Sequence, residues 1–285
     1  MRGAKPTVTL PALLALLLAG CGGEQAEPAR ERYVALGDSY TSAPGTGPAT
    51  GPPGCDRSTT NYPHLVAARL RPAEFADVSC AGARTAHLSE PQRTGEGTNP
   101  PQLEAVTEST TLVTLGIGGN DVGFIGFAAD CVATTENATP CRDELTAGGR
   151  DRIAENVTAT AGRVATALDR IAARASRARV LVVGYPTVLP QGAGCRPELP
   201  YLGTDIAYLR AGLGSLNAML AEQARAHGAE FVDTAGPSRE HDVCTSTRWV
   251  EGPRPEGEAA PLHPNQRGNR GMAEAVLATV RSEPG

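Results

Sequence analysis

The amino-acid sequence predicts an α/β protein in which helices cover both faces of a parallel sheet. Short apolar runs bounded by turn residues alternate along the chain with longer segments whose apolar residues recur at helical spacing. Strands that alternate with helices in this way are typical of a parallel sheet covered on both sides. With 285 residues, of which 40% are hydrophobic, the chain is long enough for one α/β domain with a sizeable core.

Four apolar runs of four or five residues predict the strands. Runs of this length between turn residues suit parallel strands that are buried on both faces. The first run ends at Gly37, and the second leads into a glycine-rich turn that begins with Gly116. The predicted strands are residues 33–36, 111–115, 180–183 and 229–232.

Three longer segments predict helices with one buried face. Their apolar residues step by three or four positions, which places them along a single stripe. These segments run from Ile153 to Ile171, from Ile206 to Leu220 and from Met272 to Val280. Residues 43–58 and 90–101 are rich in Gly, Pro and Thr, and predict loops.

The beginning of the chain predicts export. Residues 1–20 contain two early basic residues followed by an apolar run too short to span a bilayer, which is typical of a signal peptide. Residues 18–21 (Leu-Ala-Gly-Cys) are similar to a lipobox, in which Cys21 would carry a lipid and anchor the protein to the outer face of the plasma membrane. An ordinary secretory signal with an incidental cysteine is the alternative. Residues 21–31 would then form a polar tether, and residues 32–285 the folded domain.

The cysteine count also favours an exported protein. Without Cys21, six cysteines remain, and an even number in an exported chain indicates disulfides. No Cys-x-x-Cys pair occurs, which argues against a zinc knuckle or a thioredoxin-type site. The residues alone do not determine the pairing. The six are Cys55, Cys80, Cys131, Cys141, Cys195 and Cys244.

Composition narrows the choice of partners. A net charge of −5 gives no general attraction to nucleic acid. An aromatic content of 4% argues against a broad stacking surface for bases or sugars. The sequence contains no phosphate-binding glycine loop and no zinc-ligand spacing. We therefore expect a monomer that needs no metal or other cofactor, acts on a small molecule, and contacts the membrane only through its lipid.

Two polar segments follow predicted strands directly. Ser39, in the Gly-Asp-Ser-Tyr segment of residues 37–40, could present a nucleophilic hydroxyl at a strand-to-helix turn, with its own N–H facing a developing oxyanion. Asn120 follows the second strand and offers a side-chain amide at the same sheet edge. Taken singly, the serine is more typical of a helix cap and the asparagine of a tight turn.

Two further segments offer groups of the same chemistry. Gly82 lies in a loop where a bare backbone N–H could point at a ligand. His263 precedes Pro264, which holds it in an extended conformation just before the last predicted helix. A lone glycine or histidine in such a place is usually structural.

Together, these four segments are similar to the four signature blocks of the SGNH (GDSL) hydrolase family. They occur in the order Ser, Gly, Asn, His, and the resemblance covers nearly all of residues 32–281, with Tyr40 where the family name has leucine. The wider sequence around Ser39 and Gly82 resembles that of secreted actinobacterial esterases and lipases of this family. The resemblance implies a three-layer α/β/α, flavodoxin-like hydrolase. It also implies that Ser39 is the nucleophile, that His263 is the general base, and that Ser39, Gly82 and Asn120 supply the oxyanion hole.

One departure from the family pattern affects the histidine. Many members carry an aspartate three residues before it, and Ala260 occupies that position here. Glu256 and Glu258 lack the usual spacing. We therefore expect a Ser39–His263 dyad in which the backbone carbonyl of Ala260 accepts the imidazole Nδ1–H, since a carbonyl can hold the ring in one tautomer.

The resemblance also implies a disulfide pairing. Its actinobacterial members pair their cysteines in sequence order, which here joins Cys55 to Cys80, Cys131 to Cys141 and Cys195 to Cys244. The function expected from the resemblance is an exported carboxylic ester hydrolase that acts on acyl esters or lipids. Two alternatives remain open: an O-deacetylase of cell-wall or xylan polysaccharide, and a lipoprotein that binds small molecules without catalysis.

Overall fold

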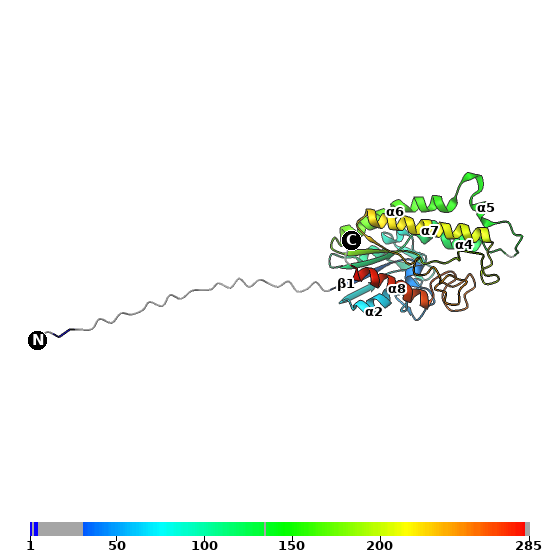
Figure 1. Ribbon diagram of the computed structural model, residues 1–285. Helices are drawn as coiled ribbons and strands as arrows, with labels where there is room; N and C mark the ends of the chain where they lie inside the picture. Colours follow the sequence, from blue (N-terminus) through cyan, green and yellow to red (C-terminus); the bar gives the residue numbers. More distant parts are fainter. Residues whose placement is uncertain (2, 5–30, 134, 283–285) are drawn as a thin grey trace.

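The computed structural model describes residues 1, 3–4, 31–133 and 135–282 (Figure 1). Cys21 and almost all of the predicted signal peptide and tether lie outside the described residues. Within the part of the chain that is described, no helix has both the length and the apolar character needed to cross a membrane.

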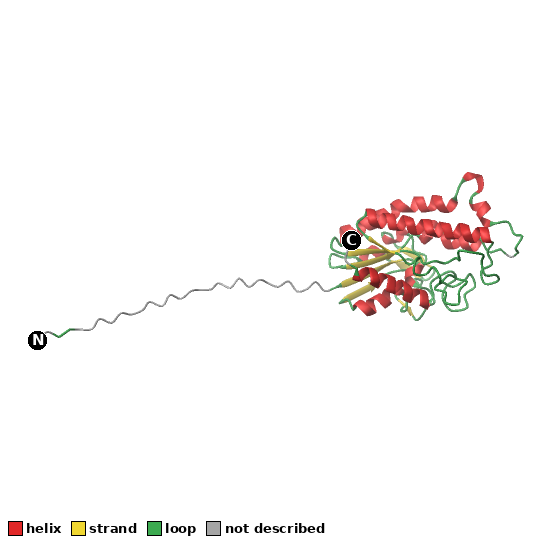
Figure 2. Cartoon of the chain, in the orientation of Figure 1, coloured by secondary structure: helices red, strands yellow, loops and turns green. Residues whose placement is uncertain are grey.

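The described residues form a parallel sheet of five strands in the order β4-β1-β7-β8-β9. Every neighbouring pair in this sheet is parallel, and Val34 of β1, for example, lies beside Val113 of β7. Figure 2 shows the strands between two layers of helices, which confirms the predicted fold class. The strands are β1 (Arg32–Gly37), β4 (Glu74–Asp77), β7 (Leu112–Gly116), β8 (Arg179–Val183) and β9 (Glu230–Val232).

Alternate residues of the strands bury against opposite helix layers. Val34 and Leu36 of β1 belong to the apolar cluster formed with α6 (Arg152–Arg174) and α7 (Gly203–Ala226), which lie side by side in Figure 1. Tyr33 and Ala35 belong to a second cluster, formed with α2 (Tyr62–Leu70) and α8 (Gln266–Arg281) on the other face. Because successive side chains of a strand point to opposite faces of the sheet, each strand packs against both helix layers, and the domain has three layers.

The four predicted strands are confirmed as β1, β7, β8 and β9, and the three predicted helices as α6, α7 and α8. β4 and α2 were not predicted. β4 is an edge strand that pairs only with β1, and acidic residues at both ends interrupt its apolar pattern. α2 is short, and Asn61 caps it by accepting the His64 N–H at 3.1 Å.

The connections carry several short elements. The predicted loop regions hold two antiparallel ribbons, and short helices cluster at the carboxyl edge of the sheet. They are β2 (Ala49–Thr50), β3 (Arg57–Ser58), β5 (Gln92–Thr94), β6 (Gly97–Asn99), α1 (Ser39–Ser42), α3 (Gly119–Val122), α4 (Phe124–Asp130), α5 (Cys141–Leu145), η1 (Thr85–Leu88), η2 (Gln102–Ala105) and η3 (Ala147–Gly149).

Three disulfides close loops in the described chain. They join Cys55 to Cys80, Cys131 to Cys141 and Cys195 to Cys244, which is the sequence-order pairing implied by the family resemblance. The first lies directly before the Gly82 segment. Its bond therefore links the loop between β2 and β3 to a segment that approaches the candidate site.

The disulfides differ in the length of chain that they close. Replacing Cys195 and Cys244 together by serine should lower the free energy of unfolding by about 1 kcal/mol more than replacing Cys131 and Cys141, because loop-closure entropy grows with loop length. The sequence separations are 49 and 10 residues. Urea unfolding of both double variants measures the difference, and an equal or reversed order would contradict it.

Candidate active site

Ser39 stands at the junction between β1 and α1. The Asp38 N–H donates to the Gly116 carbonyl at 2.9 Å, which holds the turn against the end of β7. The Asp38 carboxylate caps α1 by accepting the Tyr40 N–H at 2.9 Å. Gly37 is required because a Cβ there would lie 2.6 Å from the Gly116 carbonyl oxygen. These contacts place the largely buried Ser39 side chain at the carboxyl edge of the sheet.

His263 lies directly against Ser39 although 224 positions separate them in the sequence. Its Nε2 is 2.7 Å from the Ser39 Oγ, and its Nδ1 is 2.7 Å from the Pro261 carbonyl oxygen. A carbonyl oxygen can only accept, so Nδ1 must carry the proton of a neutral ring. Nε2 is then the acceptor, and the Ser39 hydroxyl donates to it. The tautomer that a general base requires therefore follows from one backbone contact.

Burial keeps this imidazole neutral. His263 is 8% exposed, and desolvation lowers its pKa below the ordinary value, because the charged form loses hydration. The hydrogen bond to the Pro261 carbonyl acts in the opposite direction and raises the pKa. Desolvation is the larger effect.

The expected role of the Ala260 carbonyl was wrong. That carbonyl accepts the backbone N–H of His263 at 3.1 Å, so it is engaged within the turn, and the imidazole faces the Pro261 carbonyl instead. Leu262 adopts a left-handed conformation with φ of 60°, and this bend precedes the histidine. In the described chain, no carboxylate is hydrogen-bonded to the ring. Glu256, near in sequence, forms an ion pair with Arg248.

Tyr40 links the histidine segment to the serine segment. Its hydroxyl donates to the Leu262 carbonyl at 2.6 Å, and its ring centroid lies 4.9 Å from that of His263. The edge of the Tyr185 ring packs against Tyr40, with centroids 4.9 Å apart. The position of the imidazole therefore depends on aromatic packing as well as on its own hydrogen bonds.

Gly82 and Asn120 are brought together by two neighbouring contacts. The Asn120 side-chain amide donates to the Ala83 carbonyl at 2.9 Å, and the Asp121 carboxylate accepts the Thr85 N–H at 2.9 Å. Gly82 has φ of 72°, a left-handed conformation that favours glycine.

The backbone N–H groups of Ser39 and Gly82 have no acceptor among the described residues. Within residues 31–133 and 135–282, neither the Ser39 N–H nor the Gly82 N–H donates a hydrogen bond to another residue. The side-chain amide nitrogen of Asn120 carries two hydrogens. The Ala83 carbonyl accepts one of them at 2.9 Å, which leaves the other free. The segment thus retains donor capacity for a ligand.

Sequence reasoning missed two side chains that hold these turns. The Tyr185 hydroxyl donates to the Asp38 carboxylate at 2.6 Å and accepts the Gly119 N–H at 2.7 Å, so it joins the loops after three strands. Gln102 pairs with both backbone groups of Gly37, at 2.8 and 2.9 Å. The only available signal for Tyr185 was its position just after the third predicted strand.

Asp38 has an unusual protonation equilibrium. Complete burial raises its pKa to about 7, because the carboxylate loses hydration. Hydrogen bonds from the Tyr185 hydroxyl and the Tyr40 N–H act in the opposite direction and favour the ionised form. The carboxyl group therefore supports the turn, and its two oxygens are occupied by these donors.

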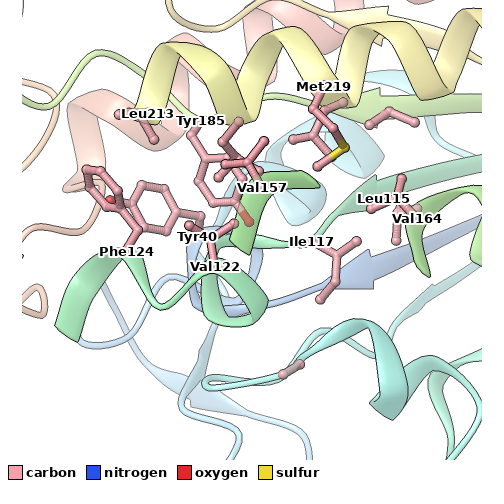
Figure 3. Close-up of a cluster of buried hydrophobic side chains, with 14 of the residues drawn as sticks. Tyr40, Leu115, Ile117, Val122, Phe124, Val157, Val164, Tyr185, Leu213 and Met219 are labelled. Atoms are coloured by element: carbon pink, nitrogen blue, oxygen red, sulfur yellow. The ribbon is translucent and has the colours of Figure 1, made fainter. Parts of the chain in front are cut away.

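An apolar recess adjoins Ser39. Phe124 and Ile125 of α4 and Leu213 of α7 line it, together with Tyr40 and Tyr185. Figure 3 shows Phe124, Leu213 and both tyrosines gathered beside α7. Its free volume is about 10 Å³, close to the space of one water molecule. Among the residues that the structure describes, no group of three or more His, Cys, Asp or Glu side chains could hold a metal ion.

Comparison with known proteins identifies relatives across most of the chain. Residues 35–270 match the model of the GDSL-like Lipase/Acylhydrolase family. Lipase 2 of Streptomyces coelicolor is 39% identical over 264 residues, which cover 89% of this chain and 86% of that protein.

Solved structures agree with the sequence relatives. The crystal structure of an extracellular lipase from Streptomyces rimosus is 30% identical, with a TM-score of 0.72, and the match covers 87% of this chain and 99% of that one. A phospholipase A1 from Streptomyces albidoflavus is 28% identical, with a TM-score of 0.73 and coverage of 88% and 99%.

The hydroxyl of Tyr185 should stabilise the site. Replacing Tyr185 by Phe removes one donor to Asp38 and one acceptor for Gly119, which we expect to lower the free energy of unfolding by about 1–3 kcal/mol. Tyr201 is the matched control, because its buried hydroxyl has no hydrogen-bond partner in the described structure. Tyr201→Phe should therefore be neutral or stabilising. Denaturant unfolding compares the two variants, and equal effects would contradict a special role for Tyr185.

Proposed function

The chain belongs to the GDSL-like Lipase/Acylhydrolase family and is a carboxylic ester hydrolase, and on this premise we propose that it cleaves acyl esters with a Ser39–His263 dyad. The observation that carries the proposal is the 2.7 Å contact between the Ser39 Oγ and the His263 Nε2. The contact between Nδ1 and the Pro261 carbonyl supports it, because the ring is thereby in the tautomer that accepts a proton from serine.

In the proposed first step, the Ser39 Oγ attacks the carbonyl carbon of the ester and its proton passes to the His263 Nε2. The negative charge that develops on the carbonyl oxygen is stabilised by the N–H groups of Ser39 and Gly82 and by the free hydrogen of the Asn120 amide. The imidazolium then gives its proton to the departing alcohol. A water molecule, activated by the same ring, hydrolyses the acyl-serine ester and regenerates the enzyme.

The Pro261 carbonyl takes the place that a carboxylate has in a triad. Its dipole holds Nδ1–H and orients the ring, although it stabilises the transient imidazolium less than a full negative charge would. Tyr40 contributes by packing its ring against the imidazole and by holding the Leu262 carbonyl. The proposal therefore assigns ring orientation to backbone and aromatic contacts.

The apolar side chains beside Ser39 favour an ester of an acyl chain as the substrate, although the recess, with a free volume of about 10 Å³, admits such a chain only if these side chains move. Phe124, Ile125 and Leu213 offer no hydrogen-bonding group for a sugar hydroxyl, which makes a polysaccharide deacetylase the weaker candidate. A purely binding lipoprotein is also the weaker candidate, because the serine and histidine of the dyad are both in place.

We extend the proposal to export. The Streptomyces rimosus relative is described as extracellular, and residues 1–20 have the pattern of a signal peptide. Attachment of a lipid to Cys21 is proposed from the lipobox-like residues 18–21.

The dyad and the oxyanion donors can be tested separately. Ser39→Ala should abolish turnover of a p-nitrophenyl ester, because the nucleophile is removed. Asn120→Ala should lower kcat by about 10²–10³, the usual effect of losing one oxyanion donor. Steady-state kinetics on folded variants, checked by circular dichroism, measures both effects. Full activity of folded Ser39→Ala would reject the mechanism.

The dependence of kcat/KM on pH should show the lowered pKa of His263. Since burial lowers the pKa of His263, the imidazole stays unprotonated below its ordinary range, and the acidic limb of kcat/KM should have its midpoint below about 6.5. Activity is thus lost only as the pH falls through this lowered pKa. A midpoint near 7 would instead implicate Asp38, whose pKa burial raises to about 7.

A further inference from the structure

A short segment, residues 249–252, lies alongside the segment that carries His263. The Glu251 N–H donates to the His263 carbonyl at 3.0 Å, and the Asn265 N–H donates to the Trp249 carbonyl at 2.8 Å. Between these two contacts the backbones form an antiparallel bridge. We call residues 249–252 the support segment, because its backbone holds the chain at the histidine and just after it.

The side chain of Glu251 ties the same two segments together a second time. Its Oε1 accepts the side-chain N–H of Asn265 at 2.9 Å, and its Oε2 lies 3.4 Å from the Arg248 Nε. Glu251 is only 6% exposed. A buried carboxylate is costly unless polar or charged partners surround it, so this side chain is restricted to the position in which both partners are met.

Asn265 connects the support segment to α8. Its side-chain oxygen caps the helix by accepting two N–H groups of the first turn, at 2.9 and 3.0 Å. Its side-chain nitrogen donates to Glu251 and also to the Arg248 carbonyl, at 3.0 Å. The oxygen of this amide therefore begins the helix, whereas the nitrogen holds the support segment. His263, two residues earlier, is fixed between the two.

The support segment is also anchored away from the histidine. The Trp249 ring stacks on the His241 ring, with centroids 5.1 Å apart and planes inclined by 7°. Gly268 of α8 leaves room for the Trp249 carbonyl, which a Cβ at that position would overlap. Shortly before the segment, Cys244 is joined to Cys195 by a disulfide. The support segment therefore has attachments of its own and can hold the histidine segment in place.

We propose that Glu251 is a positioning residue for ester hydrolysis, which holds the His263 backbone so that the imidazole stays within hydrogen-bonding distance of the Ser39 hydroxyl. The inference rests on the proposed function. The ring itself is bound to the Pro261 carbonyl, so Glu251 acts through the backbone of the histidine and through Asn265. Such positioning matters because a displacement of about 1 Å can lower a reaction rate by about 10².

Glu251→Leu tests this role, because it removes the carboxylate and keeps most of the side-chain volume. We expect kcat for p-nitrophenyl butyrate to fall about tenfold or more, because the histidine is displaced. KM should not change, since Glu251 does not line the recess beside Ser39. Glu251→Gln keeps an oxygen for Asn265 and should retain most of kcat. Kinetics at about pH 8, well above the ordinary pKa of histidine, compare variants that all have a neutral imidazole.

Glu230→Leu is the matched control. Glu230 is a half-buried carboxylate that pairs with Arg179 at 2.6 Å, and it begins β9, at the opposite edge of the sheet from Ser39. This variant loses the same charge and the same kind of ion pair, so it should lower the free energy of unfolding without lowering kcat. Urea unfolding gives the conditions in which both variants are folded. An equal fall of kcat in the two folded variants would show a general loss of stability and would overturn the proposal.

Asn265→Asp is the second variant, which decides the matter if Glu251→Leu does not fold. Aspartate keeps the side-chain oxygen that caps α8, but it has no N–H for Glu251 and sets two carboxylates against each other. We expect kcat to fall while KM stays unchanged. Wild-type kcat in folded Asn265→Asp would contradict the positioning role.

The activity of the wild-type protein separates this inference from the proposed function. If the wild type and folded Glu251→Leu hydrolyse the ester with the same kcat, the Ser39–His263 dyad stands and the role of Glu251 is rejected. If the wild type hydrolyses no ester, the proposed function is rejected, and the inference falls with it.

Discussion

The 2.7 Å hydrogen bond between the Ser39 hydroxyl and the His263 imidazole is the contact on which the rest of the site depends. The two residues come from opposite ends of the domain, so the sheet must bring the end of β1 and the segment before α8 to one edge. In this bond the Ser39 hydroxyl must be the donor and the His263 Nε2 the acceptor. The Pro261 carbonyl sets that direction because it can accept only from a protonated Nδ1.

Loops from different strands hold one another in place at this edge. Tyr185, after β8, ties Asp38, after β1, to Gly119, after β7. Asp121 ties the β7 loop to the Gly82 segment through Thr85. These are buried or half-buried polar contacts, which are costly to leave unpaired and therefore restrict the loops to one arrangement. The precision of the site thus comes from a network between loops that no single strand or helix supplies.

Two spaces of different character lie near the carboxyl edge of the sheet. The recess next to Ser39 is apolar and narrow, whereas a cavity beyond Leu213 is wide and carries Arg210 and Arg239.

The sequence by itself determined the strands β1, β7, β8 and β9 and the helices α6 to α8, because burial on one or both faces imposes a period that is visible in the residues. The four motif segments were found through their resemblance to a known family. The sequence did not determine the edge strand β4, whose single neighbour permits charges. Only the tertiary structure decided which carbonyl faces His263: the resemblance to the family pattern pointed to Ala260, but the turn engages that oxygen with the backbone and presents Pro261 instead. It also decided that Tyr185 reaches Asp38 and that Arg210 and Arg239 line one cavity. Such contacts join residues far apart in the chain, and no local pattern records the direction of a side chain or a carbonyl.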